Sequence, residues 1–336
     1  MKATLKDIAE HLNVSVSTVS RVINGKGRVG KETRERVLEA IKELNYQPNE
    51  IARSLKRQSS RTIGVIVPDI SNAFYANIIK GIEKVARENE KSIIVCNSDE
   101  NITLEEEYVQ LLAQKQVIGL IVASVGGNAE VFKQYRQHGL PIVFIDNLPK
   151  IEDNYDFVAI DNYKASYKLA EHLIEQGYRK FAIITGPLNQ STASERQEGF
   201  IKCLKDNGIE INYKFIASGE FKLESGYSIM KKWLKGIDKP MALFAANNFI
   251  AYGAIKAINE EGLKIPEDIA VVCFDAVDVT GLIKPQITSV NQPAFDIGTI
   301  AANIIIRKEK NKKVKAYEKV ILEPDMAINE SSLLKK

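Results

Sequence analysis

The chain has 336 residues, of which 45% are hydrophobic and 26% charged, with a formal net charge of +3; this composition is typical of a soluble globular protein with two or three cores. Its three cysteines, Cys96, Cys203 and Cys273, are odd in number and unclustered, so we expect reduced core residues and neither a disulfide framework nor a metal site. The N-terminus has no charged-then-apolar export segment and no apolar run reaches the length of a membrane span, so we expect a cytoplasmic protein.

Residues 4–24, TLKDIAEHLNVSVSTVSRVIN, are predicted to form two short helices joined by a tight turn. The first has an apolar stripe at helical spacing, made of Leu5, Ile8, Ala9 and Leu12. After the break at 13–15, Ser15 is placed to cap the second helix, whose inward residues would be Val19, Val22 and Ile23. The opposite face then carries Ser17, Arg21 and Asn24, and such a face can enter a DNA major groove. Helix pairs of this kind also occur in bundles that bind no DNA.

A third helix is predicted from Lys31 to Leu44, with Val37, Ile41 and Leu44 closing a three-helix core. This region is basic: residues 1–61 contain 13 Lys and Arg against 7 Asp and Glu, a net charge of about +6, which leaves about −3 for the remainder. The imbalance indicates that only the N-terminal part meets a polyanion, although a solvated basic surface with no partner is the alternative.

From Arg61 onward, short β-rich apolar runs alternate with helix-length segments, which predicts two doubly wound parallel sheets. The first set of expected strands is 62–67, 92–97, 119–125, 141–146 and 158–161, and the second is 181–186, 215–219, 242–247, 269–275 and 288–292. Helices are expected between them at, among others, 73–90, 104–116, 193–207, 224–234 and 249–261.

Polar residues recur where these strands end, at Asp69, Ser124, Asp146, Asp161, Asn247, Asp275 and Gln292. The carboxyl ends of parallel strands form the ligand crevice of an open sheet, so two facing lobes would build one cleft. The alternative is that these residues only form turns, as Asp and Asn often do.

Motifs of enzymes are missing from the chain. There is no GxGxxG after a strand, no P-loop, no HExxH and no GxSxG, and the histidines His11, His138 and His172 are isolated. We therefore expect neither catalysis nor a cofactor.

Three segments carry a specific resemblance: TVSRVIN, YQPNEIARSLK and IGVIVPDISNAFY. At this spacing they are similar to the LacI/GalR family of bacterial transcription regulators, and the likeness continues weakly to the C-terminus. The resemblance implies an all-α helix-turn-helix headpiece (1–45), a hinge helix or linker (46–60), and an α/β core of two doubly wound parallel-sheet lobes like those of periplasmic binding proteins. The lobes would be 61–161 with 291–322 and 162–290 with 323–336, with crossings near Asp161, Val290 and Leu322.

The resemblance also implies roles at the DNA end. Val16, Ser17 and Arg21 match the base-reading positions of the recognition helix. The phosphate contacts would come from Ser15, Thr18, Ser20, Asn24 and Thr33. In the hinge, Ala52, Leu55 and Lys56 would meet the minor groove, with Leu55 as an apolar wedge; the hinge would need a partner chain, because one short helix is not stable alone.

In the core, the resemblance and the strand-end pattern together give the expected effector residues: Phe74, Tyr75, Ser124, Asp146, Gln190, Arg196, Phe221, Asn248 and Asp275. Arg196 matches an arginine that grips effector hydroxyls or a carboxylate, and Asp275 an acceptor across the pocket. Three positions depart from the family pattern. Asn248 replaces a usual aspartate, Ala276 a second acid, and Gln190 the arginine of purine-responsive members, so a sugar or sugar acid is favoured over a purine.

These features together predict a transcription regulator that binds a palindromic operator as a homodimer and responds to a small sugar-like effector; a repressor is favoured over an activator. Control by a purine or nucleoside, or by a phosphoprotein corepressor docking on the first lobe, stays open. A periplasmic solute-binding protein would share the two lobes, but it would carry an export signal and would lack the DNA-binding headpiece. The C-terminal SSLLKK is too short for a tetramerising leucine heptad tail, which favours a dimer.

Overall fold

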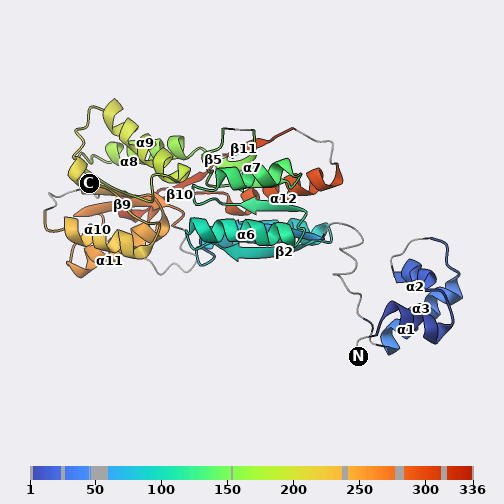
Figure 1. The fold of residues 1–336 in the computed structure, drawn as a ribbon. Coiled ribbons are helices and arrows are strands. Elements are labelled where there is room, and N and C mark those ends of the chain that lie inside the picture. The colour runs from blue at the N-terminus through green and yellow to red at the C-terminus, as the bar shows by residue number, and fades with distance from the viewer. Residues whose placement is uncertain are drawn as a thin grey trace. The chain divides into compact units, whose positions relative to one another are not determined.

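The computed structural model describes residues 3–23, 27–44, 46, 60–152, 154–236, 241–276, 284–311 and 316–334. The chain separates into two compact units, residues 1–59 and 60–336, and each is described by itself (Figure 1). Within the described residues, no helix is both long and apolar enough for a membrane span.

The described residues of the N-terminal unit form three helices, α1 (Leu5–Leu12), α2 (Val16–Ile23) and α3 (Lys31–Glu43). A capping box starts α1: the Thr4 hydroxyl accepts from the Asp7 amide while the Thr4 amide donates to the Asp7 carboxylate. The helix ends at Asn13, whose left-handed backbone (φ 51°) turns the chain. The small core contains Ile8, Ala9, Val19, Val22, Val37 and Ala40. Both predicted apolar stripes of the helix pair therefore face this core.

The first lobe of the C-terminal unit is a six-stranded sheet in the order β11-β5-β4-β3-β1-β2, and every pairing in it is parallel. Its strands are β1 (Thr62–Val67), β2 (Ser92–Asn97), β3 (Gly119–Val122), β4 (Ile142–Ile145), β5 (Asp156–Ile160) and β11 (Lys319–Leu322). Helices α5 (Ala73–Glu88) and α12 (Ala294–Lys310) cover one face, and α6 (Ile102–Gln114) and α7 (Ala129–Gln137) the other. A doubly wound lobe results, as predicted.

The second lobe has a six-stranded sheet in the order β12-β10-β9-β8-β6-β7. Its strands are β6 (Phe181–Thr185), β7 (Ile216–Ser218), β8 (Met241–Ala245), β9 (Ile269–Phe274), β10 (Thr288–Asn291) and β12 (Asp325–Ala327). The pair α8 (Asn162–Glu175) and α9 (Ser191–Asp206) covers one face, and α10 (Leu223–Trp233) with α11 (Asn248–Glu260) covers the other (Figure 1). Two short 3-10 helices, η1 (Tyr213–Phe215) and η2 (Glu330–Ser332), complete the described elements.

The sheets differ from the expectation at their edges. β11 and β12 were not predicted, and β12 runs antiparallel to β10. Both strands are short, four and three residues, and β11 alternates exposed with half-buried residues. Their apolar runs, three residues in β11 and two in β12, are shorter than the run that marks a buried parallel strand.

The chain passes between the lobes three times: between β5 and α8, between β10 and α12, and between β11 and β12. Parallel strands carry their carboxyl ends to one edge of each sheet, so the loops that follow them gather there. The three crossings connect the two lobes beside the carboxyl-end edges of their sheets. This arrangement positions the pocket described below.

Candidate functional site

The exposed face of α2 carries the predicted base-reading residues. Val16 is 44% exposed, and Ser17 and Arg21 are also exposed, while Val19 and Val22 on the opposite side are buried. The three side chains are thus free to meet a partner from solvent.

Ser15 organises the start of that helix. Its hydroxyl accepts from the Thr18 amide at 3.1 Å and hydrogen-bonds the hydroxyls of Ser17 (2.7 Å) and Thr18 (2.8 Å). Ser15 therefore caps α2 as predicted. Ser20 on α2 and Thr33 on α3 are half-buried. The remaining expected DNA contacts, Asn24, Ala52, Leu55 and Lys56, lie outside the described residues.

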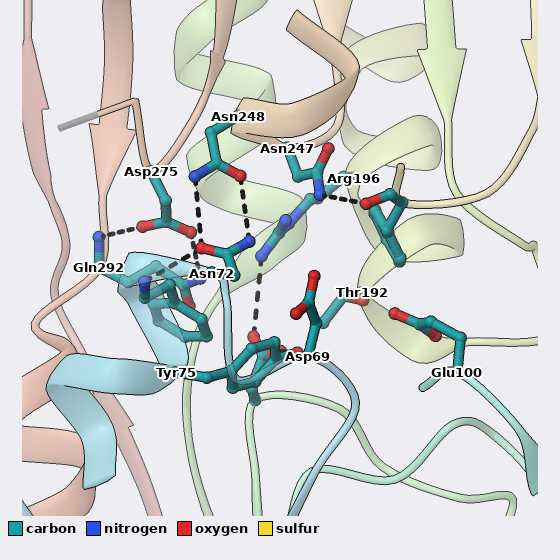
Figure 2. A pocket seen from close by; sticks show the side chains of 13 residues that line it. Asp69, Asn72, Tyr75, Glu100, Thr192, Arg196, Asn247, Asn248, Asp275 and Gln292 are labelled. Carbon is teal, nitrogen blue, oxygen red and sulfur yellow. Dashed lines mark hydrogen bonds and ion pairs between the residues drawn. The ribbon is translucent and has the colours of Figure 1, made fainter. Parts of the chain in front are cut away.

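A pocket lies between the two lobes, with about 430 Å³ of empty space including its mouth (Figure 2). Both sheets contribute to its lining, which consists of Asp69, Asn72, Phe74, Tyr75, Glu100, Asp146, Thr192, Arg196, Phe221, Asn247, Asn248, Asp275 and Gln292. The lining is mainly polar.

Five of the seven strand-end residues line this pocket, at Asp69, Asp146, Asn247, Asp275 and Gln292. The other two have different contacts. Asp161 caps α8 by accepting from the Lys164 amide at 2.8 Å, and the buried Ser124 hydroxyl donates to Glu105 at 3.2 Å. For Asp161 the turn-and-cap alternative describes what is seen.

Arg196 reaches the pocket from α9 and is almost fully buried, at 3% exposure. Its Nε donates to Asn162 Oδ1 and its Nη1 to the Ala246 carbonyl oxygen, each at 2.7 Å. The guanidinium lies over the Phe274 ring at 4.0 Å, and Nη2 is 3.8 Å from Asp146 Oδ1. Protein groups therefore fix the orientation of Arg196, and its nearest carboxylate is Asp146.

Two aspartates face the pocket from equivalent strand ends, Asp146 after β4 and Asp275 after β9. Both have a left-handed backbone, with φ 57° and 58°, a conformation that costs free energy and clusters at functional sites. Burial raises the pKa of Asp146, an effect that Arg196 and the Tyr75 hydroxyl oppose. Burial likewise raises the pKa of Asp275 to about 6, against the opposing charge of Arg196.

Two buried acceptors in this pocket have no hydrogen-bond partner, Asp146 Oδ1 and Gln292 Oε1. Their neighbouring atoms are satisfied: Tyr75 donates to Asp146 Oδ2 at 2.9 Å, and Gln292 donates through its side chain to Asp275 at 2.8 Å. An unpaired buried acceptor costs about 1–3 kcal/mol. A ligand with donor groups would remove that cost.

Amide side chains connect the lobes around the pocket. Asn72 and Asn248 exchange two hydrogen bonds of 3.1 and 3.3 Å across it (Figure 2). Gln190 does not line the pocket: its Nε2 donates to Glu100 at 2.7 Å and its Oε1 accepts from Asn147 at 2.7 Å. These contacts join residues of the first lobe to residues of the second.

The aromatic residues that were expected from the resemblance also line the pocket. Phe74 and Tyr75 lie at the start of α5, with their ring centroids 5.0 Å apart in an edge arrangement. Phe221 packs on Gly186, where a Cβ atom would lie 2.5 Å from the ring. The pocket therefore has apolar faces beside its carboxylates, and both kinds of group can contact a sugar.

Three lining residues were missed by sequence reasoning: Asn72, Glu100 and Thr192. Asn72 caps α5 by accepting from the Phe74 amide, and its place before Phe74 is the signal that could have revealed it. Glu100 follows β2 through two left-handed residues, Asp99 (φ 48°) and Glu100 itself (φ 57°). Such a turn cannot be read from non-glycine residues, so the sequence carries no signal for it.

Two family models match the chain: bacterial regulatory proteins of the lacI family over residues 4–49, and the periplasmic binding proteins and sugar binding domain of the LacI family over residues 60–321. The chain belongs to the LacI family of bacterial regulatory proteins. It is 37% identical over 315 residues to the ribose operon repressor of Halalkalibacterium halodurans, covering 94% of this chain and 92% of that one.

Solved structures of the family share the fold. The lac repressor dimer bound to operator and the anti-inducer ONPF matches with a TM-score of 0.87 and 26% identity, covering 99% of this chain and 100% of that one. A LacI-family regulator from Enterococcus faecium with bound ribose matches with a TM-score of 0.71 and 27% identity, covering 82% and 100%. This LacI-family chain is therefore a DNA-binding transcription regulator and not an enzyme.

Proposed function

We propose that this LacI-family regulator is a cytoplasmic repressor that binds a palindromic operator as a dimer and is controlled by a sugar or sugar derivative in the pocket between its lobes. The observation that carries the effector part is the pair of buried acceptors without a hydrogen-bond partner, Asp146 Oδ1 and Gln292 Oε1, in a pocket lined from both sheets. Hydroxyl groups, of which a sugar has several, can donate to such acceptors. The ribose-bound relative and the ribose operon repressor support a sugar.

The sugar is proposed to lie against Phe74, Tyr75 and Phe221, with its hydroxyls on Asp146, Asp275 and Arg196. Asn248 would contact it from the second lobe, where it now bonds Asn72. Ser124 and Gln190, which were also expected to bind the effector, act indirectly in this proposal: they hold Glu105, Asn147 and Glu100.

A ligand that touches both lobes binds differently to different lobe arrangements, and this difference is what shifts an equilibrium. In the proposed mechanism, the effector replaces the Asn72–Asn248 bonds with its own contacts and so changes the preferred arrangement. Residues 46–60 then transmit the change to the headpiece.

For the operator, we propose that Val16, Ser17 and Arg21 read bases, and that Ser15, Thr18, Ser20, Asn24 and Thr33 contact phosphates. Ala52, Leu55 and Lys56 are proposed to meet the minor groove between two half-sites. The exposure of Val16, Ser17 and Arg21 on one face of α2 supports the first assignment.

A thermal-shift panel of neutral sugars, sugar acids and nucleobases on the full chain tests the effector class. We expect a sugar to raise the melting temperature and to change operator affinity in a gel-shift assay. A hit among the nucleobases alone would favour the purine alternative instead. Arg196→Ala should lose the response to the hit, while Glu107→Gln, on the exposed part of α6, should keep it.

A further inference from the structure

The pocket contains more acidic than basic side chains. Among the described residues that line it, Asp69, Glu100, Asp146 and Asp275 carry carboxylates, and Arg196 carries the one guanidinium. We infer that this pocket selects an uncharged, hydroxyl-rich sugar, and that Glu100 and Asp69 exclude its phosphorylated and acid forms. The inference rests on the proposed sugar-controlled function and narrows it.

Contacts within the protein restrict how Arg196 can grip an anion. A carboxylate or phosphate is gripped best by two neighbouring guanidinium nitrogens, either Nε with Nη2 or Nη1 with Nη2. Here the single N–H of Nε donates to Asn162, which blocks the Nε–Nη2 pair, and one of the two N–H groups of Nη1 donates to the Ala246 carbonyl. The remaining Nη2 faces Asp146 at 3.8 Å. The guanidinium charge is thus already opposite a carboxylate of the protein.

Glu100 is held in the lining by the left-handed backbone of Asp99 and of Glu100 itself, just before α6. Gln190 also donates to Glu100 Oε2 at 2.7 Å. Burial raises the pKa of Glu100, and the nearby charges of Asp146 and Asp69 raise it further, while Gln190 and Lys222 oppose the shift. The lining is therefore already self-repelling, and another anion would add to that repulsion.

Asp69 and Lys222 complete the local charge pattern. Asp69 Oδ1 accepts from the Ser71 amide at 2.8 Å and from the Ser71 hydroxyl at 2.7 Å, which fixes its carboxylate in the lining (Figure 2). Lys222 is not a lining residue, and it lies 3.9 Å from Asp99. Lys222, whose charge acts on Glu100, is thus already opposite another carboxylate.

The buried atoms of the pocket that lack a hydrogen-bond partner also favour an uncharged ligand with donor groups over an anion. Both unpartnered atoms, Asp146 Oδ1 and Gln292 Oε1, are acceptors on side chains that are at least nine-tenths buried. Ionised phosphate and carboxylate groups are themselves acceptors and cannot satisfy them. A neutral polyol offers donors and adds no charge.

Calorimetry with matched ligands tests the inference on the full chain. The probes are two sets of three: D-ribose, D-ribose 5-phosphate and D-ribonate, and D-glucose, D-glucose 6-phosphate and D-gluconate. We expect a neutral member to bind, and its two anionic partners to bind weaker by on the order of a hundredfold. Glu100→Gln and Asp69→Asn should each reduce that ratio by roughly tenfold, mainly by improving anion binding.

Glu107→Gln is the matched control, because it removes one exposed acid of the same lobe and changes the net charge equally. A ratio that shifts as much in Glu107→Gln as in Glu100→Gln would overturn the role of the lining acids. Equal or tighter binding of the anionic members by the unaltered chain would overturn the inference while leaving a sugar-type effector. If no member of either set binds, the proposed effector class fails, and the inference fails with it.

Discussion

Arg21 is the residue whose substitution separates base reading from general DNA affinity. It is exposed on α2, and an arginine can bond two acceptors of a guanine, which is worth roughly 1–3 kcal/mol of discrimination. We expect Arg21→Ala to relax the preference at one base pair of each half-site, as measured by selection from random DNA. Lys6→Ala, on exposed α1, should leave the consensus intact. An unchanged consensus for Arg21→Ala would mean that α2 does not read bases.

Asp275 predicts how effector affinity depends on pH. Its pKa in the folded chain is about 6, raised by burial from 3.8, so it is ionised and able to accept at pH 8 and becomes protonated below pH 6. Because a sugar hydroxyl donates to the ionised form, affinity should be constant above about pH 7 and fall as pH decreases through 6, by at most about tenfold per pH unit.

Calorimetry of the sugar identified by the panel, from pH 5 to 8, measures this dependence. Asp275→Asn should bind more weakly at pH 8 and show a flatter profile, because its side chain does not titrate. The same slope in both proteins would assign the titration to another group, such as Asp146.

His172 predicts a pH limit on the stability of the second lobe. It is buried, hydrogen-bonds the Ser332 hydroxyl at 2.8 Å, and has its pKa lowered from 6.5 by burial. The unfolded chain therefore binds a proton more readily than the folded one, so this group makes stability fall as pH decreases below about 6.5. We expect His172→Gln to weaken the fall in melting temperature between pH 7 and 5. An identical fall in both proteins would rule out His172 as its source.

At the scale of elements, the helix pair α5 and α12 depends on two glycines. A Cβ on Gly298 would lie 2.1 Å from the Ile78 carbonyl oxygen, and one on Gly81 would lie 2.2 Å from the Phe295 carbonyl oxygen. Alanine normally stabilises a helix by about 1 kcal/mol relative to glycine. Here the backbones would have to separate, so Gly298→Ala should instead destabilise the chain by about 1–3 kcal/mol.

Denaturant unfolding measures this effect. Gly236→Ala is the control, because nothing lies within 4 Å of the added Cβ and its backbone is not left-handed. Equal stability of Gly298→Ala and the unaltered chain would show that α5 and α12 are not held at backbone contact.

Predicted and observed strands agree where an apolar run marks the strand, both in the buried β1 and in the largely exposed edge strand β2. β1 and β2 begin and end at the predicted residues, and the fold class is confirmed. β11 and β12 were missed because their partners lie far away in sequence, and three or four residues carry too little pattern. Apolar runs are thus legible in sequence even at a sheet edge, as in β2, whereas β11 and β12 are too short to show one.

The residues that line the pocket also divide into those that the sequence predicted and those that it did not. The lining residues Asp69, Asp146 and Asp275 could be anticipated, because parallel strands bring their ends to one edge. Glu100 could not be anticipated, because its position depends on the left-handed backbone of Asp99 and of Glu100 itself. The engagement of Arg196 by Asn162 and Ala246 was equally hidden, as those partners come from α8 and the end of β8. The resemblance alone predicted an Arg196 whose guanidinium binds the effector, without indicating its contacts within the protein.

At the scale of the whole molecule, effector and operator binding must be coupled if the proposed switch exists. A pocket between the lobes and a DNA-binding headpiece on the same chain can exchange free energy only through a change of state that both ligands sense. The coupling is reciprocal: if the sugar changes operator affinity by a given factor, the operator changes sugar affinity by the same factor, typically about 5–150-fold.

We expect the dissociation constant of the sugar, measured by calorimetry, to shift by that factor when a saturating operator duplex is added. A duplex of scrambled sequence is the control for nonspecific DNA, and Arg21→Ala should weaken the shift at a fixed operator concentration because less operator is bound. If the sugar binds equally well with and without bound operator, then the pocket does not control DNA binding. The regulator would in that case need another signal, such as a protein corepressor.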